Sequence, residues 1–121
     1  MNSRKLTILT AIAAILALGE FGSAVQIGLG TAGTDRTGWP FAAVFGVLFL
    51  VAAWLLRSRR VIAGAVFAGI LCLFEILHYP SWSKHGALGW TYDTAFAVVS
   101  LAGLIGVIVV LAGRLRRRAA A

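Results

Sequence analysis

Three of the four acidic residues of this chain lie within long apolar segments, where a charged side chain is costly. These are Glu20, Glu75 and Asp93, whereas Asp35 lies in a polar stretch beside Arg36. An ionisable group that faces lipid costs about 2.5 to 3.5 kcal/mol on insertion scales. We therefore expect the three acids to face the protein interior, and Asp35 to be a turn residue.

Helical spacing places each of these acids on a stripe that consists mostly of small side chains. The stripes are Ala13, Ala17, Ala24 and Gly28 around Glu20; Gly64, Ala68 and Leu71 before Glu75; and Ala97, Ser100 and Leu104 after Asp93. At about 100° per residue, the members of each stripe share one helix face. Stripes of small residues face other helices in membranes, so the acids should point inward with them.

The acids also fall at related depths. Glu20 and Glu75 each lie 14 residues beyond the start of their segments, which corresponds to about 21 Å along a helix. His78 should be about 4.5 Å further along, and Asp93 at about 30 Å. Taking the basic side as the inner one, this predicts a polar cluster of Glu20, Glu75, His78 and Asp93 in the outer half. The loop after it, with Trp82, Lys84 and His85, is expected to cover it as a lid.

Two carboxyl groups held close together in a low-dielectric interior cannot both ionise easily, and a proton, a metal ion or an organic cation would relieve their repulsion. The cluster therefore predicts a site that binds a proton or a cationic solute, with transport as an extension of binding. The alternative is structural: Glu20 and Glu75 are protonated and hydrogen-bond neighbouring helices, or pair with Lys84 and His85. Gln26, on the face opposite Glu20, is expected at a second interface or simply at the helix end.

Metal and haem sites receive weaker support. Glu75-Ile-Leu-His78 has the spacing that puts a carboxylate and an imidazole on one helix face in di-metal bundles. Such sites use two copies and two further carboxylates, whereas this chain has one copy. Glu75 and His78 are thus weak metal candidates that need a homodimer or added ligands such as Glu20, Asp93 or His85. Pro80 lies between His78 and His85 and disfavours a haem held by both. The sequence therefore identifies no cofactor.

Composition excludes a water-soluble globule and several kinds of site. The 121 residues are 60% hydrophobic and 12% charged, about half the usual charged share. A single cysteine, Cys72, excludes a disulfide framework, a zinc knuckle and a Cys-x-x-Cys pair within one chain. The net charge of +7 accompanies long apolar runs. We therefore expect the basic residues to interact with a membrane surface and not with nucleic acid.

Four apolar segments are long enough to cross a bilayer as helices. They are residues 6–30, 39–56, 61–79 and 90–113, which span about 27 to 37 Å against a hydrocarbon core of about 30 Å. The absence of period-two alternation argues against a barrel. We expect an all-α integral membrane protein, one transmembrane domain over residues 1–121, folded as an antiparallel four-helix bundle.

The positive charges predict an orientation. Nine of the 11 Lys and Arg residues fall on one side of the four-span arrangement, and only Arg36 and Lys84 fall on the other. Because cytoplasmic loops carry excess Lys and Arg, both termini should be cytoplasmic in a multi-pass plasma-membrane protein.

The N-terminal segment has a second interpretation. Arg4-Lys5, the apolar residues 6–19 and the small pair Ser23-Ala24 resemble a secretory signal peptide cleaved after Ala24. The apolar stretch continues through residues 25–30, however, which favours a retained first span.

Two other function classes are compatible with the sequence. A non-catalytic accessory or assembly subunit would use the small-residue stripes to receive helices of a larger membrane complex. A membrane-embedded isomerase or cyclase would use acids, His and aromatics around a lipid-like substrate, although Gly-x-Ser-x-Gly, His-Glu-x-x-His and phosphate-loop motifs are absent. The predicted partners are the lipid bilayer and either a second copy, as a homodimer, or a larger complex.

The segment Gly19-Glu20-Phe21 resembles the membrane-embedded Glu in the first helix of small multidrug-resistance transporters. Those proteins have four helices and a similar length, and they act as dimers. The third segment, residues 61–79, departs from the family because it lacks the aromatic and Gly-rich substrate motif and adds Glu75. The resemblance covers one residue and the topology.

Overall fold

The computed structural model describes residues 3–30, 38–82 and 86–120, and within them the chain is all-helical. The elements are α1 (Ser3–Leu29), α2 (Trp39–Arg57), α3 (Val61–His78), the short 3-10 helix η2 (Tyr79–Ser81) and α4 (Gly86–Ala120). Each of the four α-helices is long and apolar enough to span a membrane. The chain therefore has four candidate membrane-spanning helices, as expected for a multi-pass membrane protein.

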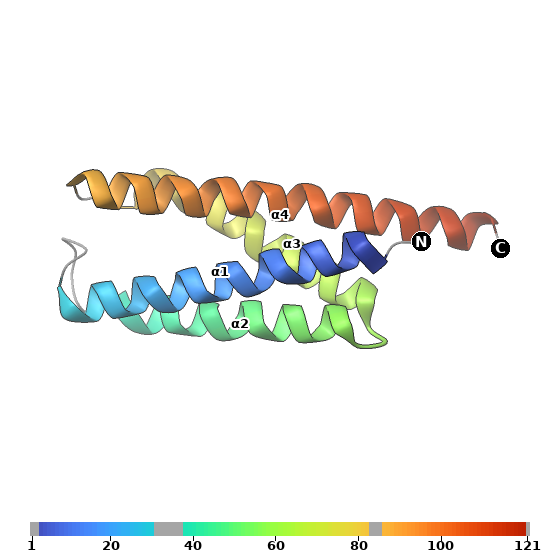
Figure 1. Ribbon diagram of the computed structural model, residues 1–121, viewed down its shortest axis with the longest axis horizontal. Coiled ribbons are helices and arrows are strands. Elements are labelled where there is room, and N and C mark those ends of the chain that lie inside the picture. The colour runs from blue at the N-terminus through green and yellow to red at the C-terminus, as the bar shows by residue number, and fades with distance from the viewer. Residues whose placement is uncertain (1–2, 31–37, 83–85, 121) are drawn as a thin grey trace.

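The four helices run alternately up and down and pack side by side (Figure 1). α1 packs against α2 and α4, and α3 packs against the same two helices. α1 and α3 thus lie across the bundle from one another. The start of α1, the end of α4 and the α2–α3 turn lie at one end of the bundle, here named the basic end (Figure 1). The end of α1, the start of α2, the end of α3 and the start of α4 lie at the opposite end (Figure 1).

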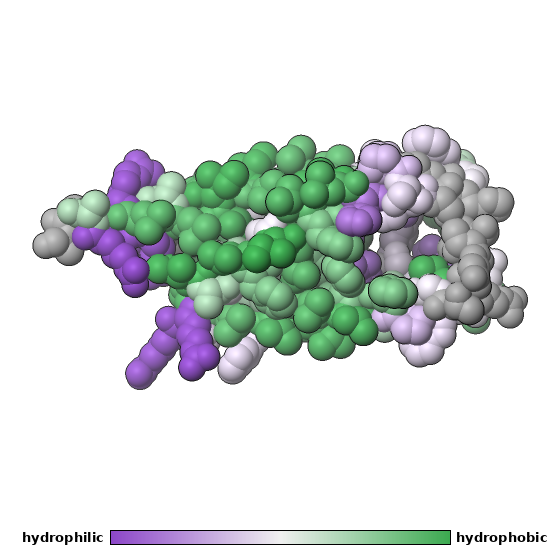
Figure 2. All heavy atoms as spheres, turned by 180° about the vertical axis from the view of Figure 1, so that it is seen from behind, coloured by the Kyte–Doolittle hydropathy of each residue, from purple (hydrophilic) through white to green (hydrophobic). Residues whose placement is uncertain are grey.

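The surface between the two ends is apolar. Large apolar side chains are exposed on every helix, including Leu18, Trp54, Leu77 and Ile108. Figure 2 shows them as a continuous hydrophobic band, with hydrophilic side chains gathered beyond it at each end. An apolar surface of this extent indicates contact with a membrane or with other proteins.

The predicted inward stripes are mostly buried. On α1, Ala13, Ala17 and Ala24 are buried and Gly28 is exposed; on α3, Gly64, Ala68 and Leu71 are all buried. The expectation for α4 is only partly right, because Ser100 is buried whereas Ala97 and Leu104 are half-buried. Phe96, Gly103 and Val107 are buried there instead. α4 contacts both α1 and α3, so its inward face is centred one residue away from the predicted line.

Helix α4 is longer than the apolar segment that predicted it. It begins at Gly86, four residues before Trp90, and continues through the Arg-rich stretch to Ala120. Arg, Leu and Ala are strong helix formers, so the helix does not stop where the apolar residues end. Its last turns project past the other helices at the basic end (Figure 1).

The turn between α2 and α3 depends on one glycine. Ser58 Oγ donates to the Leu55 carbonyl oxygen (2.7 Å) and accepts from the Arg60 backbone N–H (3.0 Å). A Cβ on Gly64 would lie 2.8 Å from the backbone nitrogen of Leu56 and 2.9 Å from Leu55 Cβ. Because backbone atoms cannot move aside easily, only glycine allows α3 to start this close to the end of α2.

We therefore expect Gly64→Ala to lower the free energy of unfolding by about 1 to 3 kcal/mol, the usual cost of overpacking. Thermal unfolding in detergent, followed by circular dichroism, measures the loss. Gly28→Ala is the matched control, since among the described residues its Cβ would meet only Trp39, at 4.0 Å; it should leave stability unchanged or slightly raised. Equal shifts for both variants would show that the close contact at Gly64 does not matter.

Candidate functional site

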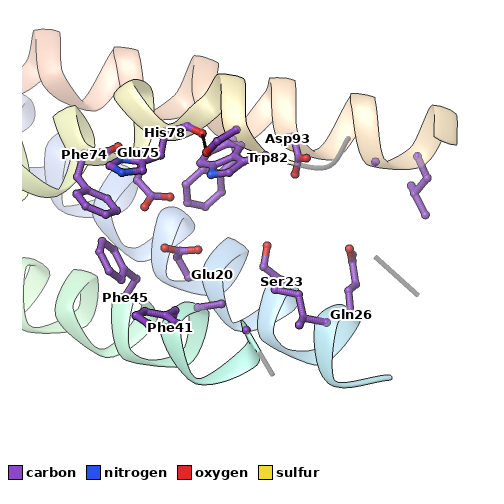
Figure 3. Close-up of a pocket in the computed structure, with 17 residues that line it drawn as sticks. Glu20, Ser23, Gln26, Phe41, Phe45, Phe74, Glu75, His78, Trp82 and Asp93 are labelled. Carbon is purple, nitrogen blue, oxygen red and sulfur yellow. Dashed lines mark hydrogen bonds between the residues drawn. The ribbon is translucent and has the colours of Figure 1, made fainter. Parts of the chain in front are cut away.

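A cavity of about 690 Å³ opens among all four helices at the end opposite the basic end. Figure 3 shows its side chains converging from α1 and α2 on one side and from α3 and α4 on the other. The polar and charged lining residues are Glu20, Ser23, Gln26, Glu75, His78, Ser81 and Asp93. The apolar and aromatic lining residues are Ile27, Gly38, Phe41, Ala42, Phe45, Phe74, Trp82, Leu88, Gly89 and Phe96.

Glu20 and Glu75 form the centre of this site. They come from α1 and α3, the two helices that lie across the bundle from each other, and their carboxyl groups point toward one another (Figure 3). The two groups are close enough to interact directly. Both residues are buried, with 7% of Glu20 and 5% of Glu75 exposed. This arrangement agrees with the equal depths deduced from the sequence.

Close contact between α1 and α4 fixes the position of Glu20. A Cβ on Gly19 would lie 2.8 Å from the ring of Phe96, and one on Gly22 would lie 2.6 Å from the Tyr92 hydroxyl oxygen. The Tyr92 hydroxyl donates a hydrogen bond to the carbonyl oxygen of Gly19. The two glycines therefore let α4 approach the residues on either side of Glu20, and the Tyr92 hydrogen bond ties the helices together there.

Aromatic rings form much of the cavity wall. The rings of Phe45 and Phe74 lie 4.8 Å apart between centroids, across α2 and α3. Trp82 packs edge-on against Phe96, with centroids 5.7 Å apart. Phe41 also borders the cavity. These phenylalanines were not among the predicted site residues. The i, i+4 spacing of Phe41 and Phe45 places them on one face of α2, but only the packing of α2 shows that this face borders the cavity.

His78 lies at the end of α3 with one ring nitrogen already engaged. Its Nδ1–H donates to the carbonyl oxygen of Phe74 (2.8 Å), which leaves Nε2 as the acceptor of a neutral ring. The imidazole also stacks on the Phe74 ring, with centroids 3.9 Å apart. His78 therefore borders the cavity and holds Phe74 in place.

The other predicted residues are distributed as follows. Asp93 lines the cavity from α4, and Trp82 lines it next to η2. Lys84 and His85 of the predicted lid lie outside the described residues. Gln26 lies in the last turn of α1, as one of its two interpretations expected, but it is not on a separate face, because its side chain borders the same cavity as Glu20 (Figure 3). The cavity is wide enough at this end of α1 to be lined by residues about 120° apart around the helix.

The chemistry of the described lining is acidic, aromatic and free of fixed positive charge. Three carboxyl groups border the cavity, and none of its described lining residues is Lys or Arg. Across residues 3–30, 38–82 and 86–120, no three His, Cys, Asp or Glu side chains are grouped to hold a metal ion. Glu75 and His78, the weak metal candidates, are thus a pair without a third grouped ligand in that part of the chain.

Comparisons with protein families, with curated proteins and with solved structures found no match to this chain.

Proposed function

We propose that this chain is a multi-pass plasma-membrane protein whose cavity binds a proton or a cationic solute. The observation that carries the proposal is the pair of buried carboxyl groups, Glu20 and Glu75, which face each other across the bundle. They do so in a cavity whose described lining contains no Lys or Arg.

The electrostatics of the pair favour a positive occupant. Two carboxylates in contact repel each other, and water screens that repulsion poorly inside a protein. A proton shared between them, or a cation placed between them, lowers the free energy of the pair. Asp93, which lines the same cavity from α4, adds negative potential for an approaching cation.

The walls favour an organic cation among the solutes. Aromatic faces attract quaternary ammonium groups through their quadrupoles, by about 2 kcal/mol or more when the cation is desolvated. Phe45, Phe74 and Trp82 present such rings within the lining. Small divalent ions need several ligands, and no three His, Cys, Asp or Glu side chains are grouped among the described residues.

Charge distribution supplies the orientation that we propose. Arg57 is the last residue of α2, and Arg59 and Arg60 follow it. The basic residues near both termini belong to the same end of the bundle. The positive-inside rule then puts both termini in the cytoplasm and the cavity in the outer half. Transport would follow if a second copy extended this cavity, which opens at one end of the bundle, into a pathway across the membrane.

The accessory-subunit alternative finds less support. Its motivation was that the small-residue stripes could receive helices of another protein, yet Ala17, Gly64 and Ala68 are buried within this bundle. The membrane-enzyme alternative would use the same cavity and acids, and it is distinguished by turnover of a lipid-like substrate that is lost when one acid is neutralised.

Glu20→Gln and Glu75→Gln should each weaken cation binding, because each removes one of the two charges that hold the cation. We expect benzyltrimethylammonium to bind the purified protein, and each variant to lose affinity about tenfold, or about 1.4 kcal/mol. Isothermal titration calorimetry measures both. Neopentylbenzene has the same shape without the charge, and its affinity should be the same for wild type, Glu20→Gln and Glu75→Gln. Unchanged cation affinity in both variants would contradict the proposal.

The same binding should depend on pH. Protons and the organic cation compete for the same carboxyl groups, so wild-type affinity for benzyltrimethylammonium should fall as pH is lowered. The dependence should be shallower in Glu75→Gln, which has one competing carboxyl fewer. Titrations at a series of pH values test this, and an affinity that rises toward acidic pH would be incompatible with competition.

Replacing Phe45 by Leu should weaken binding of the cation while keeping an apolar wall. Loss of one cation–π contact of about 1 to 2 kcal/mol corresponds to about a 5- to 30-fold loss of affinity. Phe67→Leu is the matched control, because Phe67 packs against the core and does not line the cavity. Calorimetry with benzyltrimethylammonium compares the two variants; equal affinities would mean that the aromatic wall does not contact the cation.

A further inference from the structure

A second cavity, of about 550 Å³, lies at the basic end. It is lined by the start of α3 and the end of α4, namely Arg59, Arg60, Val61, Ile62, Ala63, Arg114, Arg117 and Arg118. Five of these eight residues are arginines, and no described lining residue is acidic. The cavity is separate from the acidic site, which opens at the other end of the bundle.

No acidic side chain of the described part of the chain lines this cavity, since Glu20, Glu75 and Asp93 all line the cavity at the opposite end. Arginines kept this close together repel one another. An anion bound among them would relieve that repulsion.

Arg114 gives an independent sign of a missing partner. Its Nε is shielded from solvent and has no hydrogen-bond partner among the described residues. A buried donor without an acceptor is unfavourable, and more so when it carries a charge. By comparison, Nε of Arg116, which does not line the cavity, bonds to the carbonyl oxygen of Ala112 (3.4 Å). A bound anion would supply the acceptor that Arg114 lacks.

The first turn of α3 adds backbone donors to the same cavity. No side chain caps this helix at Arg60, and its first turn contains no acidic residue. The N–H groups of Val61, Ile62 and Ala63 have no acceptor within the helix. These three residues line the cavity, and their N–H groups carry the positive end of the helix dipole, which favours an oxyanion.

From these observations we propose that the basic end binds a phosphate group, as carried by an anionic phospholipid. Guanidinium groups and backbone N–H groups together match the oxygens of phosphate. An apolar stripe continues from the cavity along α3 through exposed Val66, Ile70 and Leu77, on the same helix face as Ile62 or close to it. A lipid with its phosphate among the arginines would lay its acyl chains on this stripe. Basic pockets between membrane helices are known binding places for such headgroups.

The arginines also contribute to topology, so the test must separate a specific site from bulk positive charge. Arg114→Lys keeps the charge and loses the planar fork that holds phosphate at two points. Arg116→Lys makes the same change on the same helix, at an arginine that does not line the cavity. The two variants are matched in charge, helix and depth.

The experiment uses the full chain in detergent and measures the shift in thermal unfolding temperature as lipid is added. The probes are dioctanoylphosphatidylglycerol, dioctanoylphosphatidylcholine and inorganic phosphate. We expect saturable stabilisation by phosphatidylglycerol and not by phosphatidylcholine. Half-saturation should move to about tenfold higher concentration in Arg114→Lys and stay unchanged in Arg116→Lys.

The inorganic phosphate arm identifies the source of the phosphate. If phosphate neither stabilises the protein nor displaces phosphatidylglycerol at equal concentration, the ligand is the lipid. If it does both, the site takes soluble phosphate compounds. Equal weakening in Arg114→Lys and Arg116→Lys, or no response to phosphatidylglycerol and phosphate in wild type, would overturn the proposal. Arg114→Gln repeats the test with the charge removed, and it should lose more affinity than Arg114→Lys.

Discussion

The meeting of two carboxyl groups on the axis of an apolar bundle is the constraint around which this molecule is arranged. An outward direction would place Glu20 and Glu75 among the apolar side chains of the bundle surface, whereas both point inward from opposite helices. Their placement requires small neighbours below them and close helix contact beside them, which Ala17, Ala68 and Gly19 provide. The aromatic walls then surround the pair with groups that tolerate a cation better than a neutral polar solute.

Charge is divided between the two ends of the bundle in a way that gives each end its own chemistry. The described acids line a cavity at one end, and five arginines line a cavity at the other. Neither set neutralises the other, because most of the length of the bundle and its apolar band lies between them (Figure 2). A membrane suits this division of charge, because the acidic cavity then faces the solutes on one side and the arginines meet the anionic headgroups on the other.

The four helices and the inward direction of the two glutamates follow from local sequence, and the structure agrees with both. Length and hydropathy define the helices, and a period of 3.6 residues directs the stripes that carry Glu20 and Glu75. The aromatic walls and the position of Gln26 did not follow, because they depend on how far apart the helices pack and on how they are rotated. Tyr92 illustrates the difference: its hydrogen bond to the Gly19 carbonyl joins residues 73 positions apart, which no periodicity can indicate.

Infrared difference spectroscopy of the carboxyl bands tests the central claim most directly. Spectra are recorded with and without benzyltrimethylammonium on wild type, Glu20→Gln, Glu75→Gln and Asp93→Asn. The account predicts that the cation perturbs carboxyl bands in wild type, that most of the signal disappears in each glutamate variant, and that Asp93→Asn retains it. Carboxyl bands that ignore the cation in wild type, or that respond equally in all four proteins, would contradict a cation site at the glutamate pair.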